Sequence, residues 1–203
     1  KDDIVLIPNP GYPTYSSAVR LAGGQVAAYT LHESMNWAPD FAELDSMVLS
    51  AHHPVKLLFV SYPHMPTGAG SDQDIFEKLV QFAIKHDILI IHDNPYSFIL
   101  NDSPMSMLEI HGAKEVVIEL NSLSKSHNMA GWRVGMICAA EQRINEIIRF
   151  KSNMDSGMFL PVQLAAAKAL ELGQEWFDQL NEVYNERREK VYELLALLKC
   201  TFH

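Results

Sequence analysis

The sequence predicts an α/β fold, specifically a three-layer α/β/α sandwich built around a mostly parallel sheet. Short apolar runs rich in β-branched residues alternate with amphipathic segments along most of the chain, the order expected when strands are joined by crossover helices. The run Ile88–Ile91 is continuously apolar, as a strand covered on both faces should be. The 203 residues, 48% of them hydrophobic, are enough to bury one sizeable core.

Each expected element follows from a local pattern. Strands are predicted where short β-rich apolar runs occur, at Ile4–Ile7, Gln25–Leu31, Lys56–Tyr62, Ile88–Ile91, Val116–Ile118 and Val134–Ile137. Helices are predicted at Tyr15–Leu21, Asp40–Leu49, Ser71–Lys85, Glu141–Ser152 and Pro161–Leu198. Pro39-Asp40 is a plausible start signal for the second helix, and Pro161 fits the first turn of the last one. A weak point at Leu172-Gly173 interrupts that last segment.

The change of character after residue 160 predicts the domain organisation. Residues 1–160 read as a large domain core, and residues 161–203 read as a long helix that leads toward a further, smaller domain. The run Asn185–Lys190 within that helix is most simply a solvated face.

Composition and charge exclude several classes of function. The formal net charge is -9, and an acidic protein repels phosphate backbones, so we expect no nucleic-acid partner. No run is apolar and long enough for a bilayer, and the chain opens without a signal-peptide pattern, so we expect no membrane association. Cys138 and Cys200 are interpreted as reduced thiols of a cytoplasmic protein. The histidines show no ligand spacing, so no metal site is expected.

Polar and aromatic residues follow the ends of four predicted strands. They are Pro8-Asn9-Pro10-Gly11-Tyr12, Pro63-His64-Met65-Pro66-Thr67-Gly68, His92-Asp93-Asn94-Pro95-Tyr96 and Asn121-Ser122-Leu123-Ser124-Lys125. In open α/β sheets, ligands bind at the carboxyl ends of the strands. The sequence therefore predicts a site at this edge of the sheet.

The residue types at this edge indicate the chemistry. A partly desolvated Lys125 would have a nucleophilic amine, and Asp93, at the end of an apolar strand, needs a cationic partner. Ser122, Ser124 and Arg133 offer hydroxyls and a guanidinium to a phosphate. Each residue alone is more simply a cap, a turn or a solvated side chain. Together, a lysine for a Schiff base, a carboxylate for a pyridinium nitrogen and a phosphate cup describe a pyridoxal-phosphate site.

The chain also resembles a known family, the fold-type I pyridoxal-phosphate enzymes of aminotransferase class I/II. The motifs that carry the resemblance are Pro10-Gly11-Tyr12-Pro13-Thr14-Tyr15, Pro66-Thr67-Gly68, Asp93-Asn94-Pro95-Tyr96, Ser122-Leu123-Ser124-Lys125 and Gly131-Trp132-Arg133-Val134-Gly135. The resemblance implies a cofactor-binding large domain, with one antiparallel strand at Val134–Ala139, and transfer of an amino group between an amino acid and a 2-oxo acid.

The resemblance also assigns roles to single residues. Lys125, Asp93 and Tyr96 are implied as catalytic: the Schiff-base lysine and proton carrier, the partner of the pyridine nitrogen, and the phenol that bonds the ring hydroxyl. Ser122 and Arg133 are implied phosphate ligands, joined by Ser124 from the reasoning above. Tyr12 and Pro95 are expected on opposite faces of the cofactor ring.

Two departures from the family pattern stand out. The family usually has Asn before Pro-Thr-Gly, whereas this chain has Met65, and a thioether is at best a weak acceptor. His64 could substitute, but we interpret it as a surface histidine beside a turn. Family members also run to about twice this length, so this chain reads as part of a large domain that on its own is inactive.

The sequence leaves two alternatives to aminotransferase activity open. One is a β-eliminating lyase of the same fold, and the other is a non-catalytic, aminotransferase-like sensing domain of a transcription regulator. The family builds its active sites at a subunit interface, so the resemblance also implies a homodimer. The identity of the amino-group donor does not follow from these residues.

Overall fold

The structure, a computed structural model, describes residues 2–201 and divides into two compact units. Lys1, Phe202 and His203 lie outside the described residues, so the predicted segments 1–160 and 161–203 are described from residue 2 and up to residue 201. Within the described residues, unit 1 contains residues 2–95, Met105–Asn121 and Gly135–Ser156. Unit 2 contains Tyr96–Pro104, Ser122–Val134 and residues 157–201.

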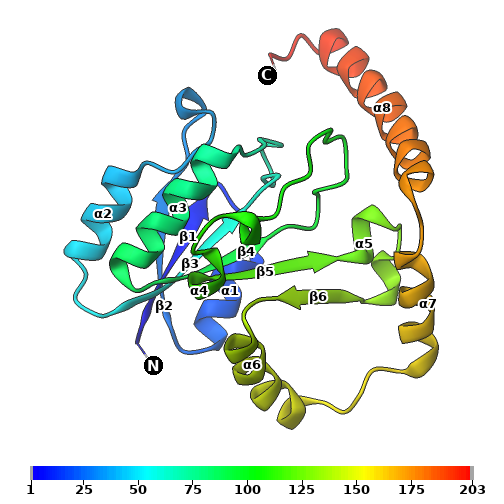
Figure 1. Ribbon diagram of the computed structural model, residues 1–203. Coiled ribbons are helices and arrows are strands. Elements are labelled where there is room, and N and C mark those ends of the chain that lie inside the picture. Colours follow the sequence, from blue (N-terminus) through cyan, green and yellow to red (C-terminus); the bar gives the residue numbers. More distant parts are fainter. Residues whose placement is uncertain (1, 202–203) are drawn as a thin grey trace. The chain divides into compact units, whose positions relative to one another are not determined.

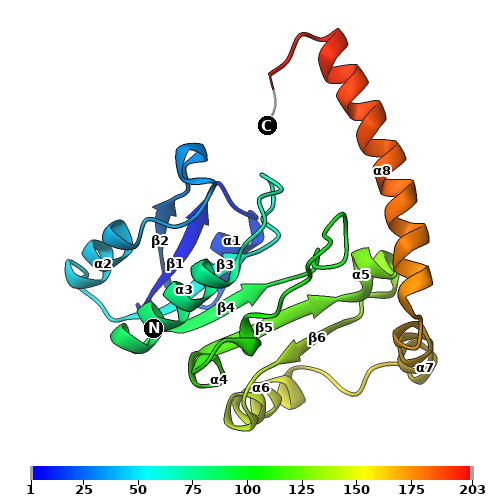
Figure 2. The same ribbon diagram turned by 45° about the horizontal axis from the view of Figure 1, so that its top comes forward.

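Unit 1 is built on a six-stranded sheet with the strand order β2-β1-β3-β4-β5-β6 (Figure 1). The strands are β1 Ile4–Asn9, β2 Gln25–Thr30, β3 Val55–Ser61, β4 Leu89–Asp93, β5 Val117–Ser122 and β6 Gly135–Cys138. The first five pair in parallel. The arrow of β6 runs opposite to that of β5 (Figures 1 and 2). The mostly parallel sheet and its single antiparallel strand are therefore as predicted.

Helices cover both faces of this sheet, which confirms the α/β/α layers. On one face, Val5 and Ile7 of β1 pack with Tyr15 and Val19 of α1 (Thr14–Leu21). Residues of opposite parity, such as Leu6 and Leu58, point to the other face. That larger core lies beneath α2 (Phe41–Leu49) and α3 (Gln73–His86). Burying each of these aliphatic side chains stabilises the fold by about 1.5–3 kcal/mol.

The ends of the helices follow their local sequence signals. Asp40 caps α2, because its Oδ1 accepts hydrogen bonds from the amides of Ala42 (2.8 Å) and Glu43 (3.3 Å). The remaining elements of unit 1 are η1 Glu33–Met35, η2 Met107–Glu109, α4 Ala113–Val116 and α6 Glu141–Met154. The short helix α4 was not predicted, and it includes Val116, which the sequence had placed in the following strand.

Unit 2 consists of helices and connecting loops. Its elements are α5 Leu123–Ser126, η3 Ala130–Trp132, α7 Leu160–Leu170 and α8 Gln174–Leu197. The break between α7 and α8 falls at the predicted weak point, and Pro161 lies in the first turn of α7. Asn181 of α8 fixes a neighbouring loop, since it accepts from the Leu100 amide (2.7 Å) and donates to the Phe98 carbonyl (2.9 Å).

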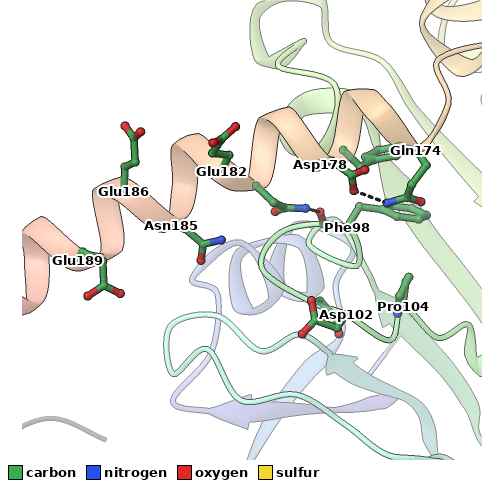
Figure 3. A pocket seen from close by; sticks show the side chains of 12 residues that line it. Phe98, Asp102, Pro104, Gln174, Asp178, Glu182, Asn185, Glu186 and Glu189 are labelled. Atoms are coloured by element: carbon green, nitrogen blue, oxygen red, sulfur yellow. Dashed lines mark hydrogen bonds between the residues drawn. The ribbon is translucent and has the colours of Figure 1, made fainter.

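A hollow of about 700 Å³ lies between this loop and α8 (Figure 3). Five carboxylates line it, from Asp102, Asp178, Glu182, Glu186 and Glu189. Such a surface disfavours a phosphate group, and the residues predicted to bind phosphate are not among those that line it.

Two features are absent from residues 2–201 of the structure. No helix there is both long and apolar enough to span a bilayer. No group of three or more His, Cys, Asp or Glu side chains in the same range is placed to hold a metal ion.

Candidate active site

The predicted site residues are distributed over both units. Tyr12, Asp93 and Pro95 belong to unit 1. Tyr96, Ser122, Ser124, Lys125 and Arg133 belong to unit 2. Within unit 1 they lie in or just beyond the carboxyl ends of β1 and β4, where the topology of a parallel sheet places ligand-binding residues.

The turn after β1 presents Tyr12. A side chain at Gly11 would place its Cβ 2.4 Å from the Pro8 carbonyl oxygen, so this tight turn accepts glycine alone. Tyr12 is 46% exposed and meets the ring of Tyr15 edge to face, with 5.8 Å between centroids. An exposed ring surface is what stacking on a planar ligand requires.

Asp93 is held by Tyr15, the last residue of the first family motif, and nothing in the sequence indicates this contact. The Tyr15 hydroxyl donates a 2.6 Å hydrogen bond to Asp93 Oδ2. Tyr15 is itself buried and stacks on Phe59, with centroids 4.8 Å apart. Burial raises the pKa of Asp93, while the Tyr15 hydrogen bond and the charge of His92 lower it, and burial prevails. The signal that could have found Tyr15 is its place in the motif Pro10–Tyr15, three residues after Tyr12.

Replacing Tyr15 by phenylalanine is expected to raise the pKa of Asp93 further. The variant removes a donor that favours the carboxylate, and Asp93 must be ionised to pair with a cation. Any activity that needs the carboxylate is lost as the pH falls through its folded-state pKa, so the acid limb should move to higher pH. A pH profile of kcat/KM for full-length Tyr15→Phe checks this. Tyr12→Phe is the control, because this substitution also removes a hydroxyl but keeps the aromatic ring and its contact. An unmoved acid limb in Tyr15→Phe would contradict the assignment.

The predicted phosphate segment forms a capped turn. Ser122 caps α5, with its Oγ accepting from the Ser124 amide at 3.1 Å. The structure thus brings Ser122 and Ser124 together. Arg133 is exposed and has a left-handed backbone (φ 56°), and its Nη1 donates to the Ala130 carbonyl at 2.8 Å. That bond fixes the guanidinium within its own turn.

Lys125 and Tyr96 lie close together in unit 2. The Nζ atom of Lys125 is 5.8 Å from the centroid of the Tyr96 ring, within the range of a cation–π contact. Both side chains are partly exposed, so an amine and a phenol are accessible side by side. Two of the three predicted catalytic residues are therefore neighbours.

The interpretation of His64 as a surface residue is wrong. Its side chain is buried, with 3% exposed, and its Nδ1 lies 2.8 Å from Thr67 Oγ1. The turn closes tightly around it, because the His64 amide donates to the Ala69 carbonyl and the Gly68 amide donates to the His64 carbonyl. Burial lowers the pKa of His64, against a smaller opposing effect of the Pro10 carbonyl. A neutral imidazole therefore lies beside the partly exposed Met65.

Comparisons with known proteins all point to one family. The sequence model of aminotransferase class I and II matches residues 1–202. LL-diaminopimelate aminotransferase of Dehalococcoides mccartyi is 44% identical over 195 residues, covering 95% of this chain and 50% of that protein. The corresponding enzyme of Halothermothrix orenii is 42% identical over 210 residues, with coverages of 99% and 53%.

A solved structure agrees with these relatives. Substrate-bound BacF from Bacillus subtilis superposes with a TM-score of 0.89 at 39% identity, covering 95% of this chain and 49% of that one. The chain thus spans about half the length of the relatives that it matches. The cofactor of the family is pyridoxal phosphate, as the sequence predicted. This chain belongs to the class I and II aminotransferase family.

Proposed function

We propose that the complete protein transfers an amino group between an amino acid and a 2-oxo acid, with pyridoxal phosphate bound to Lys125 as a Schiff base. The observation that carries the proposal is the partly buried carboxylate of Asp93, held by Tyr15 at the end of β4. A carboxylate whose charge is disfavoured by burial gains most from a cationic ligand atom. The protonated pyridine nitrogen of the cofactor is such an atom.

The remaining residues fit the same group. The cofactor, when bound, supplies an electron sink for the electrons released at the substrate α-carbon. Tyr96 would donate its phenol hydrogen bond to the ring hydroxyl, and Tyr12 and Pro95 would contact the ring faces. Ser122, Ser124 and Arg133 would bind the phosphate. Lys125 would take the proton from the α-carbon of the amino acid and deliver it to the C4′ carbon of the cofactor. In this proposal, residues 1–160 form the cofactor-binding core, and residues 161–203 form the connection toward a smaller domain.

Absorbance of the full-length protein tests this function. The cofactor band should shift when an amino acid is added and return when a 2-oxo acid follows. LL-diaminopimelate is the first donor to try, because the relatives in D. mccartyi and H. orenii act on it. A shift without turnover for every donor would instead identify a sensing domain. Release of ammonia together with a 2-oxo acid would identify a lyase.

We also propose that the complete protein is a cytoplasmic homodimer. Apolar side chains at the start of α7 support the dimer, because Met158, Phe159, Leu160 and Leu164 are between 46% and 72% exposed. The free thiols of Cys138 and Cys200 fit a reducing compartment.

Sedimentation of the full-length protein over a wide concentration range is expected to show a dimer wherever the enzyme is active. As a test of the surface, Phe159→Asp should dissociate the dimer, whereas Ile84→Asp, at a similarly exposed apolar position on α3, should not. A monomer that keeps full activity at every concentration would rule the dimer out.

A further inference from the structure

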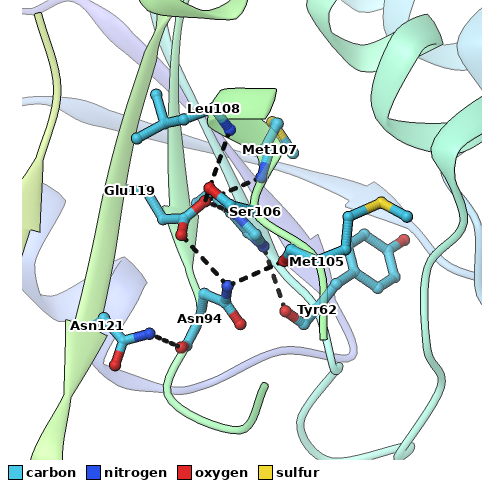
Figure 4. Close-up of polar contacts among 9 residues, drawn as sticks. Tyr62, Asn94, Met105, Ser106, Met107, Leu108, Glu119 and Asn121 are labelled. Carbon is cyan, nitrogen blue, oxygen red and sulfur yellow. Dashed lines mark hydrogen bonds and ion pairs between the residues drawn. The ribbon is translucent and has the colours of Figure 1, made fainter. Parts of the chain in front are cut away.

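The segment between Asn94 and Ser106, which we call the Tyr96 loop, is closed at its base by one carboxylate (Figure 4). Glu119 Oε2 accepts hydrogen bonds from the Ser106 hydroxyl (2.9 Å) and the Met107 amide (3.0 Å), and Glu119 Oε1 accepts one from Asn94 Nδ2 (3.4 Å). These donors come from both ends of the loop. The two ends therefore meet at a single side chain of unit 1.

Glu119 is itself held in the core by a buried histidine. His92 is fully buried and Glu119 is 7% exposed, and His92 Nδ1 lies 3.1 Å from Glu119 Oε2. On the other side of the ring, His92 Nε2 lies 3.2 Å from the Tyr62 carbonyl oxygen. The Asn94 carbonyl also accepts a hydrogen bond from Asn121 Nδ2 (3.0 Å). A buried network with its partners in place is rigid, so the base of the Tyr96 loop is fixed.

Within unit 2, the tip of the same loop is held by α8. Asn181 Oδ1 accepts a hydrogen bond from the Leu100 amide (2.7 Å), and Asn181 Nδ2 donates one to the Phe98 carbonyl (2.9 Å). Both backbone groups adjoin the turn that begins at Tyr96, whose carbonyl accepts from the Ile99 amide at 3.0 Å. Tyr96 thus lies between the fixed base of its loop and a tip that Asn181 holds.

The same helix holds the turn that carries Lys125. Trp176 Nε1 donates a 2.8 Å hydrogen bond to the carbonyl of Ser126, the residue directly after Lys125. The next residue of α8, Phe177, meets the ring of His127 edge to face, with 5.5 Å between centroids. Helix α8 therefore fixes the backbone that follows the lysine.

A pair of stacked rings joins the two sets of contacts. Phe98 of the Tyr96 loop stacks on Phe177, with 4.9 Å between centroids and 23° between ring planes. Asn181 lies four residues after Phe177, so the two side chains share one face of α8. That face contacts the Tyr96 loop and the turn of Lys125 at the same time.

We propose that Asn181 and Trp176 are positioning residues, which together set the Tyr96 phenol against the Lys125 amine. Both act through the backbone, Asn181 at the turn of Tyr96 and Trp176 at the Ser126 carbonyl. The placement that they preserve is that of Lys125 Nζ over the Tyr96 ring, 5.8 Å from its centroid. Its value toward the cofactor rests on the proposed function, because a misplacement of about 1 Å can lower a rate by roughly 10²-fold.

The first experiment measures this placement in the full-length protein without cofactor, from the ¹H NMR shift of the Lys125 ε-methylene group. The signal is assigned by its loss in Lys125→Ala. Protons above an aromatic face are shifted upfield, so Tyr96→Leu, which lacks the ring, gives the unshifted position. We expect the signal to move toward that position in Asn181→Leu and in Trp176→Phe, which keeps a ring but removes the indole N–H.

The matched control is Asn185→Leu, one turn further along α8. The Asn185 side chain accepts a hydrogen bond from Arg188 of the same helix, so its loss should leave the Lys125 signal in place. An unmoved signal in either Asn181→Leu or Trp176→Phe would overturn the proposal. An equal movement in Asn185→Leu would overturn it as well.

The second experiment separates positioning from a general loss of structure, by a double-mutant cycle on the dissociation constant for pyridoxal phosphate. Asn181→Leu should weaken binding by roughly threefold to tenfold, as expected when about one hydrogen bond is lost. In the Tyr96→Phe background the same substitution should have no further effect, because both changes then remove one contact. Additive losses would refute the role of Asn181. Failure of the proposed function would show separately, as a protein whose Lys125 signal behaves as expected but which binds no pyridoxal phosphate.

Discussion

Replacing Lys125 by alanine in the full-length protein is expected to abolish transamination, lowering kcat by roughly 10³-fold or more. The side chain is proposed to supply both the covalent link to the cofactor and the base for the α-proton, and the neighbouring Tyr96 phenol is too weak a base to replace it. Steady-state kinetics with a responsive amino acid donor measures the effect. Lys114→Ala, at an exposed position on α4, is the control and should retain activity.

The site of cofactor attachment can be mapped independently of turnover. Borohydride reduction of the loaded protein, followed by peptide mapping, should find the label on Lys125. The lysine lies beside Tyr96 in a capped turn, whereas lysines such as Lys56, Lys78 and Lys114 are exposed. A label spread over several lysines, or an active Lys125→Ala variant, would contradict the assignment of Lys125 as the residue that binds the cofactor.

Replacing Asp93 by alanine is expected to lower turnover by roughly 10²-fold or more while changing the free energy of unfolding by about 1 kcal/mol. The expected losses differ because burial already disfavours the ionised carboxylate, so removing it relieves a cost that offsets the lost bond from Tyr15. Kinetics and urea denaturation of the same full-length samples measure the two quantities.

The matched variant is Asp93→Asn, which keeps an oxygen for the Tyr15 hydroxyl but carries no charge. If the charge of Asp93 is what matters, Asp93→Asn and Asp93→Ala should lose similar activity. Near-normal turnover in Asp93→Asn would show that Asp93 serves as a hydrogen-bond acceptor alone. Near-normal turnover in both would remove Asp93 from the catalytic set.

The sheet could be predicted from the sequence because its signals are local. Continuous apolar runs such as Ile88–Ile91 report burial on both faces, and the structure places Leu6 and Leu58 in one core and Val5 and Ile7 in the other. The start of α2 could also be predicted, because Asp40 accepts hydrogen bonds from amides within three residues of itself. Short helices such as α4 were not, because four residues carry no periodic pattern.

Other parts of the candidate site depend on partners that are distant in sequence. Tyr15 and Asp93 are separated by 78 residues, and nothing in the sequence near Tyr15 indicates an acceptor for its hydroxyl. His64 looked like a turn residue from its neighbours, whereas its burial follows from the way residues 64–69 close on themselves. The family motifs pointed to Lys125 and Asp93 and also contain Tyr15, but they gave no sign that Tyr15 and Asp93 are hydrogen-bonded to each other.

The buried pair of His92 and Glu119 has a consequence for how the chain can vary over evolution. A substitution that removes one member leaves the other as an uncompensated polar or charged group in the core, which costs about 3–5 kcal/mol of stability. Replacing both by apolar residues of similar volume is often neutral. Ser106 can be lost more cheaply, because Glu119 keeps the Met107 amide and Asn94 Nδ2 as donors. Among homologous sequences, positions 92 and 119 should therefore change together or not at all, so the pair forms a two-site signature that could mark a subgroup of the family.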